Sequence, residues 1–170
     1  MAVANSVSDW KNKTISLIVN DDEIMDCLDM TDEEQEEPVY TRIFPYNHIP
    51  YTQSESKVFI TLTVDIPKIT FNKVWAYPRM TVRIICHQDK MRLNKAGVSD
   101  TRIDYMAKLI SKLLVGRKDY GYGNLRLATD YEDTYNFYYH YRELVFIGED
   151  LVQNPCEGKY WYGLRWIKSL

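Results

Sequence analysis

The sequence predicts an α+β fold, in which an antiparallel β-sheet of about four strands (mixed pairing is possible) carries one long helix packed across it, plus an N-terminal helical segment. Two observations predict this class. Residues 99–116 repeat apolar side chains every three or four positions, which is the period of an amphipathic helix. Two segments before this helix and two after it alternate in the manner of half-buried strands. The simplest arrangement lays the helix across one face of the sheet.

Length and composition favour one globular domain spanning residues 1–170. The chain has 170 residues, with 45% hydrophobic and 26% charged residues, which is ordinary for a globular protein with a real core. We divide it into a helical N-terminal region with an acidic loop (1–38), an α+β core (39–148) and an aromatic C-terminal tail (149–170). The net charge of −3 argues against bulk electrostatic attraction to DNA or to an anionic membrane.

Targeting signals and cysteine spacing add two further expectations. No apolar run is long enough to span a bilayer, and the first residues lack the pattern of a secretion signal, so we expect synthesis in a cytoplasm and no membrane contact. Cys27, Cys86 and Cys156 are widely separated and form no CxxC pair. We therefore expect reduced, packed thiols in place of a disulfide framework or a zinc site.

The N-terminal region is predicted to hold two short helical pieces followed by a loop. Ser6 or Ser8 can cap the first helix, and residues 20–22 mark a break before a second helical turn around Ile24. Residues 29–37 then carry six carboxylates and one apolar side chain. That composition is typical of a solvated, mobile loop.

The core region begins with an extended arm and continues with alternating segments. Residues 40–51 combine two prolines with several aromatic side chains, which favours an ordered extended arm at a sheet edge or across the sheet. The alternating segments predict strands, the first ended by Pro67, at residues 58–66, 80–87, 125–130 and 137–147. The helix between the second and third strands is expected to begin with Ser99 as its cap and to end at Gly116.

The last predicted strand, residues 137–147, is apolar or aromatic on both of its faces. One face carries Tyr138, Leu144 and Phe146, and the other includes Val145 and Ile147. A single helix layer covers one face, so the other face needs a second contact. We expect a neighbouring subunit or a tail tube to cover the face that holds Phe146, with the chain's own aromatic tail or N-terminal arm as the alternative.

No pattern of residues indicates a particular reaction. Asp100 and Asp104 lie four apart, as paired catalytic carboxylates or metal ligands would, but nearby basic residues make ordinary helix-surface charge the simpler interpretation. The histidines fall in three separate segments, and the Gly121-x-Gly123 pair lacks the other residues of a phosphate loop. We therefore predict no catalytic residue, no metal and no cofactor. Basic residues near both ends of the helix leave open a patch that faces DNA or an acidic protein: Lys90, Arg92, Lys95, Arg102, Arg117 and Lys118.

Four stretches of the chain resemble neck proteins of tailed bacteriophages. They are Tyr40-Thr-Arg-Ile-Phe-Pro-Tyr, Val82-Arg-Ile-Ile-Cys-His-Gln, Thr101-Arg-Ile-Asp-Tyr-Met-Ala and Tyr120-Gly-Tyr-Gly-Asn-Leu-Arg-Leu. The resemblance is closest to the tail-completion, or tail-terminator, proteins that join the tail tube to the head. It covers roughly residues 40–146 and is weaker in the acidic N-terminal region and the aromatic tail.

The resemblance implies a structural virion protein without enzymatic activity. It implies a homo-oligomeric ring, as a hexamer, located in the tail or neck of a virion assembled in a bacterial cytoplasm. Its partners would be the phage tail tube protein and a neck or stopper protein, and DNA would touch it only while passing through the ring lumen. A closed ring needs two different contact surfaces on each subunit. The candidate interface residues are Phe44, Tyr46, Tyr51, Tyr138, Leu144, Phe146, Trp161 and Trp166.

Three other interpretations remain open at this point. The chain can be another ring of the phage neck, an adaptor or a stopper. It can be a metal-dependent nuclease or hydrolase that uses Asp100, Asp104 and a carboxylate from the acidic run. It can also be a monomeric module that binds peptides through the aromatic arm.

Overall fold

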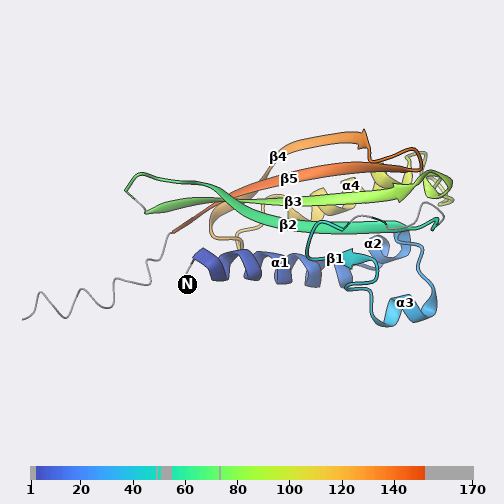
Figure 1. The fold of residues 1–170 in the computed structure, drawn as a ribbon, viewed down its shortest axis with the longest axis horizontal. Helices are drawn as coiled ribbons and strands as arrows, with labels where there is room; N and C mark the ends of the chain where they lie inside the picture. Colours follow the sequence, from blue (N-terminus) through green and yellow to red (C-terminus); the bar gives the residue numbers. More distant parts are fainter. Residues whose placement is uncertain (1–2, 49, 51–54, 73, 152–170) are drawn as a thin grey trace, which may run out of the picture.

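A five-stranded sheet forms the centre of the protein, seen here in a computed structural model that describes residues 3–48, 50, 55–72 and 74–151 (Figure 1). The strands follow the spatial order β1-β2-β3-β5-β4. The central pairs are antiparallel, and β1 runs parallel to β2 at one edge. The strand bounds are β1 Ile43–Phe44, β2 Val58–Ile69, β3 Trp75–His87, β4 Tyr122–Thr134 and β5 Tyr139–Leu151. The predicted α+β class is confirmed, with one strand more than expected.

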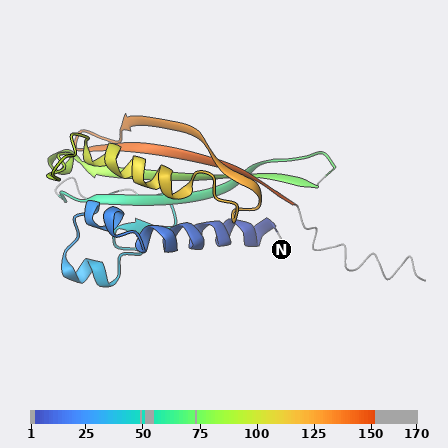
Figure 2. The ribbon, with the colours of Figure 1, turned by 180° about the vertical axis from the view of Figure 1, so that it is seen from behind.

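Helices cover one face of this sheet, and no described helix lies on the other face (Figure 2). The helix α4 (Arg102–Leu114) packs on β3 and β5, and α1 (Val3–Val19) packs mainly on β2. The short helix α2 (Asp22–Cys27) lies against α4. The layer thus contains two long helices, where the sequence predicted one long helix across the sheet and a separate N-terminal helical segment.

The main core lies between the sheet and the helices. The apolar stripe of α4 faces the sheet, and Ile103, Met106 and Ile110 are fully buried there, as the helical period predicted. Trp10 and Ile18 of α1 are buried in the same cluster. The hydroxyl groups of Thr14 and Tyr120, both buried, share a 2.7 Å hydrogen bond within this layer. One continuous core therefore holds all of the major helices to the sheet.

Three helix starts differ from the sequence prediction. Helix α1 begins at Val3, before the predicted caps Ser6 and Ser8, and local capping decides the other two starts. Thr101, and not Ser99, caps α4: its hydroxyl oxygen accepts the backbone N–H of Asp104 at 3.3 Å. The acidic run is also not a simple loop, since residues Asp32–Glu36 form the helix α3. The Thr31 hydroxyl and the Glu34 carboxylate exchange hydrogen bonds with each other's backbone N–H groups, which is a capping box. This reciprocal cap stabilises one helical turn despite the repulsion between neighbouring carboxylates.

The hairpin formed by β2 and β3 is longer than predicted and projects beyond the helices (Figure 1). Pro67 does not end β2, because the register shifts between Asp65 and Lys68 and the ladder continues beyond it. A bulge of this kind accommodates a residue that has no N–H to donate. The structure thus contains a two-stranded extension beyond Pro67, where the sequence analysis had predicted that the strand ends.

Candidate protein interface

The face of the sheet that points away from the helices is a candidate protein interface, which we call the open face. Its residues alternate with core residues along each strand. Across the middle of the sheet, Thr63 of β2 lies opposite Thr81 of β3, which lies opposite Val145 of β5. All three side chains are half-buried. No helix of the described part of the chain covers them (Figure 1).

One end of the open face carries a small aromatic cluster. Phe59, Ile85 and Tyr139 are buried there, and Phe44 from the arm packs over them. The ring of His48 stacks on Phe44 with centroids 3.8 Å apart and an angle of 8° between the planes. Desolvation by burial lowers the pKa of His48, because an apolar environment disfavours the charged imidazolium. The arm was predicted at a sheet edge or across the sheet; it forms the edge strand β1 and also reaches over this end of the open face, where it builds a second, smaller core.

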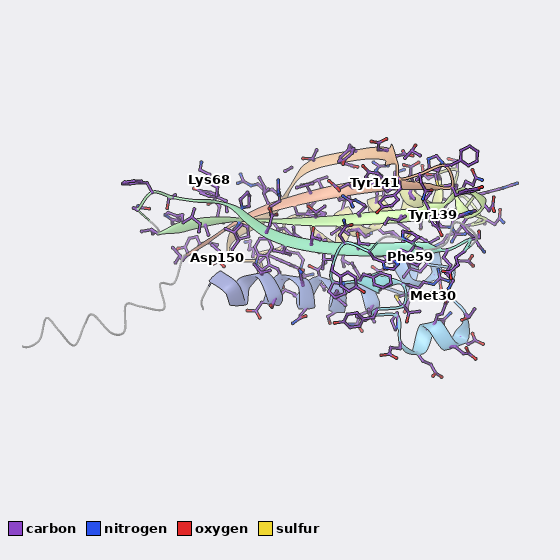
Figure 3. All side chains as sticks on the ribbon, viewed as in Figure 1. Met30, Phe59, Lys68, Tyr139, Tyr141 and Asp150 are labelled. Carbon is purple, nitrogen blue, oxygen red and sulfur yellow. The ribbon has the colours of Figure 1, made fainter. Side chains whose placement is uncertain are left out.

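Three partly exposed tyrosines pack beside this aromatic cluster. Tyr135, Tyr138 and Tyr141 pack against it while remaining partly exposed. Figure 3 shows Tyr141 and Tyr139 near the same end of the sheet as Phe59. The hydroxyl groups of Tyr131 and Tyr141 share a 3.3 Å hydrogen bond, which raises the pKa of Tyr131 to about 12. Large, partly exposed aromatic side chains of this kind are enriched where proteins bind one another.

The centre of the open face holds a partly buried ion pair. Arg83 Nε donates to Glu143 Oε2 at 2.9 Å, and its Nη1 donates to Asn47 Oδ1 at the same distance. The guanidinium also lies over the Tyr141 ring, 5.0 Å from its centroid. Asn47 belongs to the arm, so this pair ties the arm to the sheet and keeps the middle of the face polar.

Three of the predicted interface residues lie on or beside this face. Phe44 is buried in the aromatic cluster, whereas Tyr46 is 47% exposed and contacts the edge of Phe44. Tyr138 is partly buried, with its ring parallel to that of His87 at a centroid distance of 6.0 Å. Tyr46 and Tyr138 are therefore accessible to a partner, and Phe44 packs against Tyr46.

The expectation for Leu144 and Phe146 requires a correction. Both side chains are fully buried in the main core, on the face covered by the helices. Their neighbour Val145 lies on the open face. The two faces of β5 were assigned in the wrong order because both are apolar, and the alternation alone does not say which one the helix covers. Tyr51, Trp161 and Trp166 lie outside the described residues.

The residues weighed for catalysis each have a structural partner. Lys108 donates to Asp100 at 2.7 Å, and Arg142 binds Asp104 while also bridging to Asp130. Burial raises the pKa of the Cys86 thiol to about 12, so it stays protonated near neutral pH. Within the described part of the chain, no group of three or more His, Cys, Asp or Glu side chains gathers as a metal site would require. The described helices also include none that is long and apolar enough to cross a membrane.

Two exposed features were missed by reasoning from the sequence. The tip of the β2–β3 hairpin presents Phe71, whose side chain is completely exposed. Tyr40 is 64% exposed and adopts a positive φ of 69°, a conformation that is rare for residues other than glycine. The exposure of Phe71 could have been predicted, because a phenylalanine between two lysines in a turn is an unusual pattern. Nothing in the sequence marks the backbone conformation of Tyr40.

Together these features define an α+β protein whose distinctive surfaces are a half-covered sheet and exposed aromatic groups. The family model YomW matches residues 13–147, which is most of the chain. The chain therefore belongs to the YomW family, a phage-derived family of Bacillus prophage type, and is a phage-related protein. No curated protein and no solved structure matches it.

Proposed function

We propose that this protein is a structural component of the phage neck, which caps the tail tube and joins it to the head. The observation that carries the proposal is the open face in a member of a phage-derived family. A sheet with an aromatic end and no helix layer in the described residues is a surface suited to another protein. The resemblance of residues 40–146 to tail-completion proteins supports the same assignment.

The protein acts as a homo-oligomeric ring in this proposal, with six subunits in the tail-terminator arrangement. A ring closes through heterologous contacts, in which two different surfaces of each subunit meet. The open face and the exposed aromatic groups supply more than one such surface. The tail tube protein and a neck or stopper protein would bind above and below, and DNA would pass through the lumen during infection.

The role is structural and not catalytic in this proposal. The partners of Asp100 and Asp104 support it, because both carboxylates are already held by basic side chains. The burial of Cys27 and Cys86 supports it as well, since desolvation raises the pKa of both thiols and keeps them protonated. These groups stabilise the fold, and the open face carries the function.

A phage that lacks this chain tests the proposal. We expect lysates with DNA-filled heads and separate tails, and we expect the wild-type chain supplied in trans to restore joined particles. Antibody labelling should find the chain at the head-proximal end of isolated tails. Label on isolated heads would instead indicate an adaptor or a stopper. Intact, infectious particles formed without the chain would refute a joining role altogether.

A further inference from the structure

The tip of the β2–β3 hairpin presents three apolar side chains, Ile69, Phe71 and Val74, which we together call the knob. Ile69, Phe71 and Val74 are 48%, 106% and 42% exposed. The stem is ordered, because the backbone N–H of Thr70 donates to the Trp75 carbonyl at 2.8 Å and the Trp75 N–H returns a bond to the Thr70 hydroxyl at 3.0 Å. A hydrogen-bonded hairpin that presents exposed apolar side chains loses less conformational entropy on binding than an irregular loop does.

The knob is also cationic. Residues 66–75 contain two lysines and no acidic residue. Lys68 lies on the projecting stem, where its ammonium sits over the Tyr77 ring at 5.4 Å from the centroid (Figure 3). No ion pair joins Lys68 to any residue that the structure describes. Its positive charge is therefore available to a partner.

A groove that matches the knob lies near the other end of the molecule, between α1 and the start of the arm. Ile15 and Val19 form one wall, and Val39, Tyr40 and Pro45 form the other. Its volume is about 310 Å³, at the small end of the range for binding cavities. The Tyr40 ring remains 64% exposed at the rim even though its backbone is held in the strained left-handed conformation.

An acidic run directly precedes one wall of this groove in the chain. Residues 31–40 contain five acidic residues and no basic one. Glu34 is bound by Arg42, but Asp32, Glu33, Glu36 and Glu37 are exposed and have no ion pair within the described residues. The run leads directly through Pro38 into Val39 and Tyr40. The groove thus has apolar walls with Asn12, Ser16 and Asn20 between them and follows an acidic run in the chain, whereas the knob has an apolar tip with the cation of Lys68 beside it.

We propose that the knob of one copy of this chain inserts Phe71 into the groove of a second copy. The two surfaces match in both apolar character and charge. The hairpin projects from the end of the sheet opposite to α3, so one chain does not bring its own knob to its own groove (Figure 1). A contact between two different surfaces of identical chains repeats from copy to copy, and it closes into a ring when the rotation between neighbouring copies divides a full turn. This inference rests on the proposed ring and identifies the surfaces that form it.

Two exposed apolar side chains, one in the knob and one outside it, test the knob. Phe71→Asp should weaken self-association of the full chain by about thirtyfold or more, because a buried aromatic anchor carries much of the binding energy at such contacts. Val115→Asp makes a similar apolar-to-acidic change just after α4, where Val115 is 49% exposed and lies outside the knob, the groove and the open face, and should leave association unchanged. Sedimentation velocity and light scattering would measure both, with circular dichroism to verify folding.

A mixing experiment tests the pairing of knob with groove. Tyr40→Lys places a cation at the groove and should also give monomers. Mixed in equal amounts, Phe71→Asp supplies an intact groove and Tyr40→Lys an intact knob, so the mixture should form heterodimers and nothing larger. Unchanged assembly of either variant, or a mixture that remains monomeric, would overturn the inference.

The tail-joining proposal is judged separately from this contact. A wild-type chain that remains monomeric at high concentration would also overturn the knob-and-groove pairing, but phage particles lacking the chain would still report on joining. If Phe71→Asp assembles normally yet fails to restore joined particles, the knob binds a different neck or tail protein, and the inference fails while the proposed function stands.

Discussion

The two faces of the sheet are built from alternate residues of the same strands, yet they differ in what covers them. On the helix-covered face, Ile60, Ile84 and Leu144 are fully buried beneath α1 and α4. On the open face, Thr63, Thr81 and Val145 are half-buried without a helix above them. A change of one position along a strand moves a side chain from the core to the surface. The comparison separates residues that hold the fold together from residues available to a partner.

The arm modifies this contrast at one end of the sheet. Phe44 and His48 stack over Phe59, so the aromatic end of the open face is a small core of its own. The phenol of Tyr139 donates a hydrogen bond to the Glu55 carbonyl, which closes the cluster from the side. The remainder of the face carries threonines and ion pairs. We therefore expect a partner to contact the rim of this cluster and not its buried centre.

Adjacent residues of β5 provide the largest test of this difference. Phe146→Ala should reduce the free energy of unfolding by about 3–5 kcal/mol, because it removes a fully buried ring from the main core. Val145→Ala, one position away on the open face, should cost about 1 kcal/mol or less. Urea unfolding followed by circular dichroism measures both values. Equal losses would mean that the open face is covered in the folded chain.

The sequence predicted the covered face better than the open one, for physical reasons. The period of α4 was sufficient to assign Ile110 to the core, since a helix presents a single apolar stripe. The strand β5 has two apolar stripes, so Phe146 was expected at an interface and was found in the core. Contacts between residues distant in sequence decide which face of β5 the helices cover, and local alternation gives no information about those contacts.

Local signals also competed within the sequence. The six carboxylates of residues 29–37 indicated a loop, but the capping box of Thr31 and Glu34 fixed a helix there. Pro67 indicated the end of a strand, but a register shift let β2 continue into the hairpin. As a result, neither the knob nor the groove beside Tyr40 was predicted from the sequence. Both depend on how distant segments pack together, and the groove also depends on the positive φ of Tyr40, which no residue pattern predicts.

A pH titration would test how the arm is held over the open face. Arg42, directly before β1, is 3% exposed and donates to Glu34 at 2.7 Å, with its guanidinium near the Phe59 ring. The hydrogen bond from Arg42 lowers the pKa of Glu34 from 4.5 to about 2. Because the pKa is lower in the folded state, the ionised carboxylate stabilises the fold above about pH 4.5. This stabilisation is lost as the pH falls towards 2.

Glu34→Gln should therefore reduce stability near pH 7 by about 1.5–3 kcal/mol, since it removes hydrogen bonds between charged groups and leaves Arg42 without its carboxylate. The variant should also show a shallower loss of stability between pH 4.5 and 2 than the wild type. Glu33→Gln, an exposed neighbour on the same helix, serves as the control and should change neither quantity appreciably. If Glu34→Gln and the wild type lose stability equally steeply between pH 4.5 and 2, the Arg42–Glu34 pair does not hold the arm in place.

The smallest effects are expected from ion pairs within the open face, where exposure decides their strength. The Arg83–Glu143 pair has side chains 22% and 12% exposed, whereas those of the Arg79–Asp65 pair, nearer the hairpin, are 47% and 50% exposed. Water and salt screen the outer pair more strongly, although its bidentate geometry is good. Glu143→Gln should cost about 1 kcal/mol, and Asp65→Asn about 0.5 kcal/mol or less. Adding 1 M salt should reduce the smaller effect further and affect the larger one less. Comparable, equally salt-sensitive losses would mean that the centre of the open face is as wet as its edge, which would weaken its assignment as a protein interface.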